Sequence, residues 1–274
     1  MKNPAGTFAR SLIIVLITLT SITPFYVLLL IALNSPSRRL ADRLFFLPEF
    51  YFRNFADAWR LSSMGTAIMN SIIITGGALA IVVLVASCAG YAIARFPTRF
   101  HRMVFNTFLF CMMIPPIINT VPLYTLMRSI GGINTRWAMI LVSAANVLPF
   151  SVFLYSSFIR SFSREIEEAA LVDGCTRFSA FWMVTFPLLK PVTSAVVIIT
   201  GLGIWNNYAQ AVFFLQRESV RTIPLAVSMF FQQYGARWNL MAAASAIGMA
   251  PAVLVFLLFQ KYFIKGLAAG AVKG

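Results

Sequence analysis

The sequence predicts an all-α, polytopic membrane protein with six transmembrane helices. Two features of the composition indicate this class. Hydrophobic residues make up 59% of the chain and charged residues only 11%, whereas soluble domains are about 25% charged. The third observation is the length of the apolar runs, because about 20 apolar residues cross a bilayer core as one helix. The six runs without a charged residue are residues 11–33, 67–94, 103–127, 137–159, 191–216 and 240–260.

The first run is longer than the apolar region of a signal peptide, so we expect it to remain as a membrane helix. No repeat or linker-like segment divides the chain, and we expect residues 1–274 to form a single transmembrane domain. An even number of spans places both termini on one side of the membrane. Arg38, Arg39 and Arg43 after the first run favour external termini, but the densely basic link between the second and third runs favours the cytoplasmic termini that we expect.

Two segments of the first half depart from plain membrane helices. The loop of residues 34–66 is long enough for an outer amphipathic segment that lies on the membrane surface. The third run contains Pro115, Pro116 and Pro122, which must interrupt its hydrogen-bond ladder. Non-helical backbone inside a bilayer persists only where protein or water covers it, so we expect a broken span that does not face lipid.

Residues 160–190, between the fourth and fifth runs, form a charged loop. It contains four of the eight acidic residues of the chain: Glu165, Glu167, Glu168 and Asp173. Ser163 can cap a short helix whose first turn is acidic, as the helix dipole favours. Gly174 is placed to end this helix, because glycine accepts the left-handed conformation. Thr176 can cap a second short helix, and Pro187 marks the start of the next element. This arrangement predicts an exposed docking surface.

Polar and aromatic residues interrupt the apolar fifth run. They are Trp205, Asn206, Asn207, Tyr208 and Gln210. Adjacent amides in hydrocarbon cost several kcal/mol unless they meet partners or water. They either hydrogen-bond to neighbouring helices or line a path for a polar solute, since aromatic faces and amides suit sugar rings and hydroxyls. Trp205, Asn206, Asn207 and Tyr208 are the candidates for such a path. Further candidates in the third and fourth runs are Asn119, Tyr124 and Asn146.

Several other functions fit the sequence less well. The net charge of +14 is scattered between apolar runs, which does not indicate a nucleic-acid-binding surface. One histidine and three cysteines without a CxxC pair form no recognisable metal site or disulfide framework. The six runs contain no Asp, Glu or His, which argues against an ion-coupled secondary transporter, although sodium sites built from backbone carbonyls need none. A membrane-embedded enzyme would need reactive groups near the bilayer, but half of the acids lie in one loop and the others are Asp42, Glu49, Asp57 and Glu218.

The charged loop resembles the EAA motif of ATP-binding-cassette (ABC) importer permeases. Glu168, Ala169 and Ala170 are followed by three residues, Gly174 and nine more residues, and then by Val-Thr-Phe-Pro at residues 184–187. The family pattern has Ile-x-Leu-Pro at this point, so both exchanges are apolar. The resemblance implies that this loop couples the permease to ATPase subunits through a short helix. The implied coupling residues are Glu167, Glu168, Ala169, Ala170, Asp173, Gly174 and Pro187.

Further segments resemble the six-span permeases of maltose-type carbohydrate importers. They include residues 89–96 (AGYAIARF), 122–124, 205–206, 222–224 and 266–274. The family implies a heterodimer with a second permease subunit, two ATP-binding subunits, and an extracytoplasmic solute-binding protein that delivers the carbohydrate. It also implies a location in a bacterial or archaeal cytoplasmic membrane, in contact with lipid. The tail ending in Lys273 and Gly274 resembles tails that reach the ATPase interface.

The chain itself is then not an enzyme. It lacks the GxxxxGK[ST] pattern that binds nucleotide phosphates, so ATP and Mg²⁺ belong to the partner subunits and no cofactor, metal or catalytic residue is expected here. We expect Glu168 to offer its carboxylate to an ATPase arginine. A permease for amino acids, peptides or phosphate is the alternative within the same class, and the sequence does not distinguish among sugars, polyols and glycerol phosphate.

Overall fold

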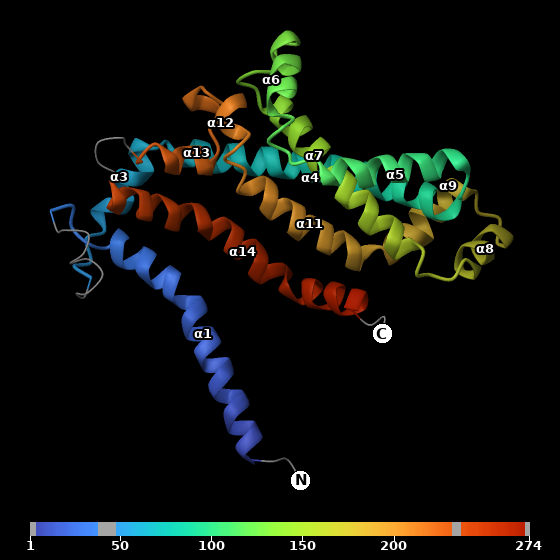
Figure 1. The fold of residues 1–274 in the computed structure, drawn as a ribbon, viewed down its shortest axis with the longest axis horizontal. Coiled ribbons are helices and arrows are strands. Elements are labelled where there is room, and N and C mark those ends of the chain that lie inside the picture. The colour runs from blue at the N-terminus through green and yellow to red at the C-terminus, as the bar shows by residue number, and fades with distance from the viewer. Residues whose placement is uncertain (1–3, 38–47, 232–236, 272–274) are drawn as a thin grey trace. The chain divides into compact units, whose positions relative to one another are not determined.

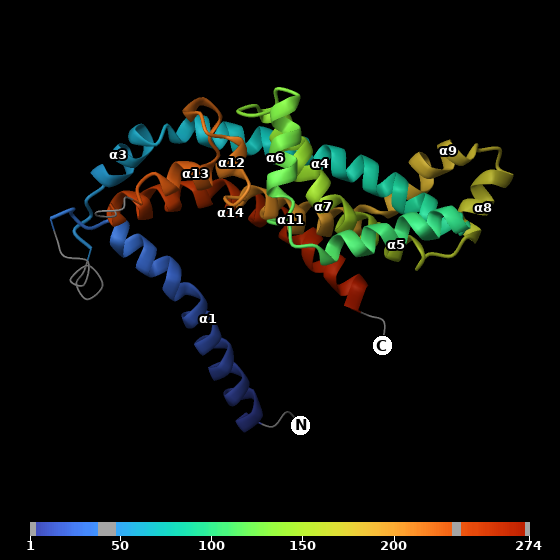
Figure 2. The ribbon, with the colours of Figure 1, turned by 45° about the horizontal axis from the view of Figure 1, so that its top comes forward.

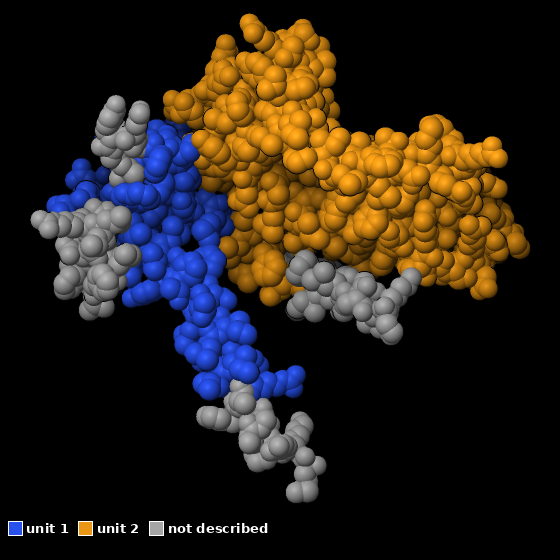
Figure 3. Space-filling view, viewed as in Figure 1, with its two compact units in different colours: residues 1–65, 226–251 blue, residues 66–225, 252–274 orange. Residues whose placement is uncertain are grey.

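A computed structural model describes residues 4–37, 48–231 and 237–271. Every regular element in these ranges is a helix, which confirms the all-α class (Figure 1). Contacts divide the chain into two compact units, one formed by residues 1–65 and 226–251 and the other by residues 66–225 and 252–274 (Figure 3). The expectation of a single transmembrane domain stays a prediction.

The first unit is held together by buried asparagine side chains. It contains α1 (Pro4–Ala32), α3 (Arg53–Leu61) and the first part of α14 (Trp238–Ala271). Asn54 donates hydrogen bonds to the carbonyl oxygens of Ala32 and Asn34 at 2.7 and 2.9 Å, and Asn239 donates to Asn54 Oδ1 at 2.7 Å. Asn54 thereby satisfies backbone groups that the end of α1 leaves free. α3 lies inside the loop in which an amphipathic segment was expected.

The second unit is built on α4 (Met64–Arg95), α7 (Arg136–Ile159) and α11 (Lys190–Trp205). Buried residues recur every four positions along α4, so one face of this helix enters the core. They are Ile74, Ala78, Val82 and Ala86. A Cβ on Gly90 would lie 2.7 Å from Tyr155 Cβ and 3.0 Å from the backbone nitrogen of Ser156, so only glycine permits this approach of α4 to α7.

Within the described residues, four helices are long and apolar enough to cross a membrane, namely α1, α4, α7 and α14. A fifth span is possible if the segment Arg177–Leu188 and α11, which meet at a bend of 70°, are counted together. The predicted third span, residues 103–127, is instead divided between α5 (Arg99–Met113) and α6 (Thr120–Ser129). Pro115 and Pro116 lie in the non-helical break, as the sequence predicted. The expected number of six spans is therefore not confirmed. Figure 2 shows α5 and α6 as two separate helices.

The predicted fifth span also ends early. α11 stops at Trp205, with Asn206 as its C-cap, so the polar segment that follows is not inside a long helix as expected. The chain continues through three short helices, α12 (Ala211–Phe214), the 3₁₀ helix η2 (Glu218–Val220) and α13 (Ile223–Ser228). Adjacent amides lose less at a helix end than within a helix that crosses hydrocarbon, because they can bond to the free backbone groups there.

Candidate functional site

The charged loop folds as two short helices joined at Gly174. α8 (Glu165–Val172) carries Glu165, Glu167 and Glu168 in its first turn, and α9 (Arg177–Ala180) is capped by Thr176, which accepts from the backbone nitrogen of Ser179 at 3.2 Å. The predicted second cap is thus confirmed. Ser163 accepts from the backbone nitrogen of Glu165 at 3.3 Å, although Arg164 occupies the N-cap position itself.

Gly174 ends α8 in the way that the sequence predicted. Its φ angle is +90°, in the left-handed region that favours glycine. The backbone nitrogen of Gly174 donates to the carbonyl of Leu171 at 3.1 Å, and that of Cys175 donates to Ala170 at 3.0 Å. These two bonds form a Schellman motif, which turns the chain sharply toward α9.

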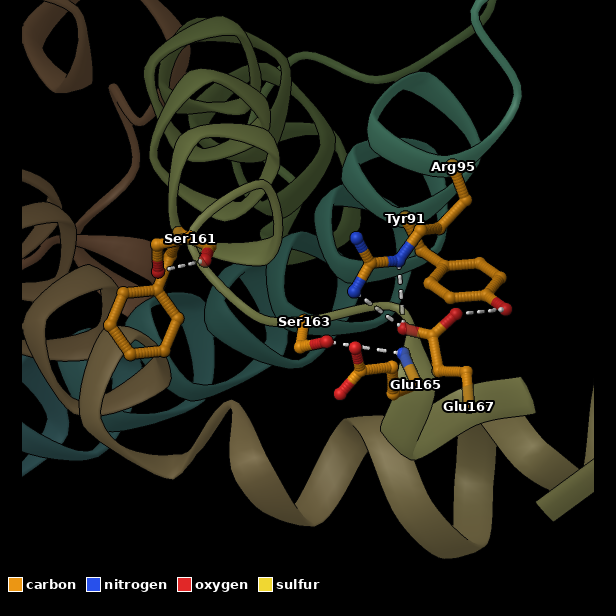
Figure 4. A network of polar contacts seen from close by, with 7 residues as sticks. Tyr91, Arg95, Ser161, Ser163, Glu165 and Glu167 are labelled. Carbon is orange, nitrogen blue, oxygen red and sulfur yellow. Dashed lines mark hydrogen bonds and ion pairs between the residues drawn. The ribbon is translucent and has the colours of Figure 1, made fainter. Parts of the chain in front are cut away.

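Glu167 points inward to the end of α4 (Figure 4). Its Oε1 accepts from Arg95 Nε at 2.8 Å and lies 2.7 Å from Arg95 Nη2, while its Oε2 accepts from the hydroxyl of Tyr91 at 3.2 Å. The side chains of Arg95 and Glu167 are only 7% and 13% exposed. A charged pair with such geometry ties α8 firmly to α4, because each charge would be costly to bury alone.

Aromatic rings pack against Tyr91, the hydroxyl partner of Glu167. The ring of Tyr91 lies 4.9 Å from that of Phe181, and the guanidinium of Arg177 lies 5.2 Å over the ring of Phe96. Phe181 begins a π-helical turn, η1 (Phe181–Thr185), that continues into α10 (Phe186–Leu188). Phe186, which stands where the family pattern has Leu, packs against Trp182 with 5.0 Å between the two ring centroids. The rings therefore hold the second half of the loop beside α4.

The opposite side of the loop faces outward. Glu165, Glu168 and Asp173 are exposed, as are Ala169 and Pro187, whereas Ala170 is buried. Large apolar side chains of the same loop are also exposed: Ile166, Val172, Phe178 and Met183. Exposed apolar side chains together with charged ones are typical of a protein–protein contact.

The polar residues predicted to line a solute path divide into two groups. Asn146 on α7 and Asn207 both donate to Oε1 of Gln210, at 2.8 and 2.9 Å. Gln210 is 4% exposed and its own Nε2 finds no partner in the described part of the chain. Gln210 belongs to the polar run of the sequence but is not among the residues predicted to line a solute path. Its burial emerges only from the packing of the helices.

The remaining candidates of this set do not share the hydrogen bonds to Gln210 Oε1. Asn206 and Tyr208 are exposed, and Trp205 is half-buried at the end of α11. Tyr124 on α6 packs edge-on against Phe214 at 6.2 Å. Asn119 is the exposed N-cap of α6 and caps no backbone group with its side chain.

In the described ranges no group of three or more His, Cys, Asp or Glu residues is placed to hold a metal ion. The polar chemistry of the site is thus that of carboxylates, guanidinium groups and amides. These groups form protein contacts and bind hydroxyl groups.

Comparisons with known proteins identify the family of the chain. The family described as "Binding-protein-dependent transport system inner membrane component" matches residues 86–269. The melibiose/raffinose/stachyose import permease protein MelC of Bacillus subtilis is 40% identical over 252 residues, which cover 92% of this chain and 91% of that protein. The diacetylchitobiose uptake system permease protein NgcG of Streptomyces coelicolor is 32% identical over 232 residues, which cover 84% and 77%.

A solved structure has the same fold. It is a crystal structure of a bacterial ABC transporter involved in the import of the acidic polysaccharide alginate, and it matches with a TM-score of 0.80 and 19% identity, over 96% of this chain and 99% of that chain. The family match begins just before Arg95 and includes the whole charged loop. The chain therefore belongs to the family of inner membrane components of binding-protein-dependent transport systems, as a multi-pass permease subunit of the ABC importer class.

Proposed function

We propose that this chain forms half of the translocation pathway of an ATP-driven carbohydrate importer and couples that pathway to ATP-binding subunits through α8. The observation that carries this proposal is that two neighbouring glutamates on α8 have different surroundings. The side chain of Glu167 is only 13% exposed and is paired with Arg95, whereas Glu168 next to it is exposed. One carboxylate anchors the helix and the other is available to a partner.

Coupling follows from these two contacts. Glu168 offers a charge-assisted hydrogen bond to an arginine of the ATPase subunit, and the exposed apolar side chains beside it fill that subunit's cleft. When ATP closes the ATPase dimer, α8 moves with it. Arg95 and Tyr91 then transmit the movement of Glu167 to α4, whose apolar face lies in the core. The chain has no phosphate-binding motif, so ATP and Mg²⁺ are bound, and ATP is hydrolysed, on the partner subunits.

A second permease subunit would cover the broken third span. Between α5 and α6 the backbone is non-helical, and Ile114, Ile117 and Ile118 are 45%, 56% and 63% exposed. Backbone groups of this kind are not stable against lipid, while the apolar side chains do not favour water. A companion protein chain satisfies both conditions. An extracytoplasmic solute-binding protein and cytoplasmic termini complete the proposed assembly, and the tail at Lys273 and Gly274 lies outside the described residues.

The carbohydrate assignment rests on the relatives, which are named for sugar import, and on the polar segment after α11. We place the exposed Asn206 and Tyr208 on the solute path, with Trp205 and Asn207 beside them. Asn119, Tyr124 and Asn146 are its candidates on other helices. Amides bind sugar hydroxyls, and aromatic rings pack against the apolar faces of sugar rings.

Uptake in the native host tests the substrate class. Deleting the gene should abolish uptake of at least one labelled di- or oligosaccharide, and expressing the wild-type chain should restore it. Normal uptake of every carbohydrate tested, together with lost uptake of an amino acid, peptide or phosphate, would contradict the carbohydrate assignment while leaving the coupling role of α8 intact.

A further inference from the structure

A cluster of arginines lies close to α8 and takes no part in the proposed coupling contacts of Glu167 and Glu168. It consists of Arg102 on α5, Arg160 at the end of α7 and Arg164 at the start of α8. All three side chains are exposed, and no carboxylate within the described ranges forms an ion pair with them. The nearby Arg95, in contrast, is paired with Glu167. Three unpaired guanidinium groups at one site favour an anionic ligand.

These arginines line a hollow of about 510 Å³. Asn106 of α5 adds a polar group to its wall, and Ile93, Ala94, Pro97 and Phe105 supply apolar surface. The guanidinium of Arg160 lies 5.1 Å over the ring of Phe105, which fixes the position of this charge. A volume of this size is within the range of about 300–1,000 Å³ that is typical of small-molecule sites.

A second hollow adjoins the first along α5. It measures about 410 Å³, shares Arg102 and Asn106 with the first, and continues past Met103 to Phe110. Met103 and Phe110 are 60% and 69% exposed, and no residue of α5 is buried. These positions recur at helical spacing, so they form one stripe that is basic at the start of α5 and apolar further along.

We propose that this stripe binds an anionic phospholipid. The arginines hold the phosphate, because the planar guanidinium matches phosphate oxygens with paired hydrogen bonds, and an acyl chain lies along Met103 and Phe110. A soluble anion would gain nothing from the apolar half of the stripe, and a lipid uses both halves. Basic pockets between membrane helices on the cytoplasmic side are suited to such headgroups, and the orientation proposed above places this one in the inner leaflet.

Lipid retention by the assembled transporter tests the proposal. The complex is purified in detergent with phosphatidylglycerol, passed through a sizing column in neutral phosphatidylcholine, and analysed for bound phosphatidylglycerol by mass spectrometry. Arg102→Gln with Arg160→Gln should weaken binding about fivefold for each arginine removed. Arg128→Gln with Arg217→Gln changes the net charge equally at exposed sites elsewhere and should leave retention unchanged.

A further variant and a competition experiment distinguish a phospholipid site from a soluble-anion site and from a protein contact. Met103→Ser keeps every charge and should weaken phosphatidylglycerol binding without affecting assembly. Displacement of the lipid by inorganic phosphate at comparable concentrations would show a soluble-anion site and overturn the assignment. Equal retention by the wild type and both double variants would overturn it as well, and so would loss of the ATPase subunit from the Arg102→Gln, Arg160→Gln complex, since the arginines would then be a protein contact.

Discussion

At the residue scale, neighbouring glutamates on α8 have opposite surroundings. Glu167 and Glu168 lie about 100° apart around a helix of 3.6 residues per turn, so one faces α4 and the other faces outward. The side chain of Glu167 is 13% exposed and is paired with Arg95, whereas Glu168 is exposed. The motif alone does not separate the anchoring carboxylate from the contacting one.

Replacing Glu167 tests the anchor. Glu167→Ala leaves Arg95 buried without its partner, and such a loss costs about 3–5 kcal/mol. We expect α8 to detach from α4, with uptake lost and ATP hydrolysis no longer stimulated by solute, while the chain stays inserted. Exchange of the two residues, Arg95→Glu with Glu167→Arg, should restore part of the coupling. Normal coupling in Glu167→Ala would contradict the anchoring role.

Gly174 offers a test of backbone conformation without steric contact. A Cβ on Gly174 would meet no atom within 4 Å, so Gly174→Ala costs only the left-handed backbone conformation, about 1–2 kcal/mol. Gly203→Ala on α11 also meets no atom within 4 Å, but it lies inside a helix and should be neutral or stabilising. Binding of the ATPase subunit to purified variants measures the difference. Equal binding by both would show that the turn at Gly174 does not position α8.

At the scale of elements, α4 and α7 are in close contact at Gly90. Gly90→Ala must push the helices apart, because its Cβ would lie 2.7 Å from Tyr155 Cβ, and such overpacking costs about 1–3 kcal/mol. Gly76→Ala is the matched control on the same helix, since nothing lies within 4 Å of its Cβ. The melting temperature of the purified complex should fall for the first variant only. An equal fall in melting temperature for Gly76→Ala would show that the close contact with Tyr155 is not the cause of the destabilisation.

The segment after α11 combines packing and pathway residues that substitutions can separate. Gln210→Leu removes the acceptor shared by the part-buried Asn146 and Asn207, and a buried polar group left unpaired costs about 1–3 kcal/mol, so thermal stability should fall. Asn206→Leu changes an exposed side chain and should alter transport or transport-linked ATPase activity with little change in stability. An unchanged transport profile for Asn206→Leu would place Asn206 outside the pathway.

The elements differ in how well the sequence predicted them. Runs with continuous apolar character matched closely, as for residues 137–159 against α7 (Arg136–Ile159), because burial of one long helix decides their bounds. Runs broken by prolines or amides did not match, since the path of the backbone after α5 and α11 depends on tertiary contacts. The pairing of Arg95 with Glu167 also needed the structure, because it joins residues 72 positions apart.

At the scale of the whole molecule, the central claim is that the outward face of α8 docks an ATPase subunit. The acids and apolar residues exposed there face solvent in the isolated chain. Large apolar side chains are not favoured in water, so their exposure on a charged loop favours association with another protein. The family to which the chain belongs works in transport systems of several components. The residues of α8 that contact the ATPase subunit are therefore what remains to be tested.

Affinity purification of the tagged chain from its native host in mild detergent tests this claim most directly. We expect an ATPase and a second multi-span chain to be recovered with the wild type. Glu168→Lys should lose the ATPase while remaining inserted and keeping the second permease, because it reverses the charge offered to the partner's arginine. Glu218→Lys, on η2, makes the same change outside the charged loop and should keep both partners. Full recovery of the ATPase with Glu168→Lys would contradict the docking role of α8.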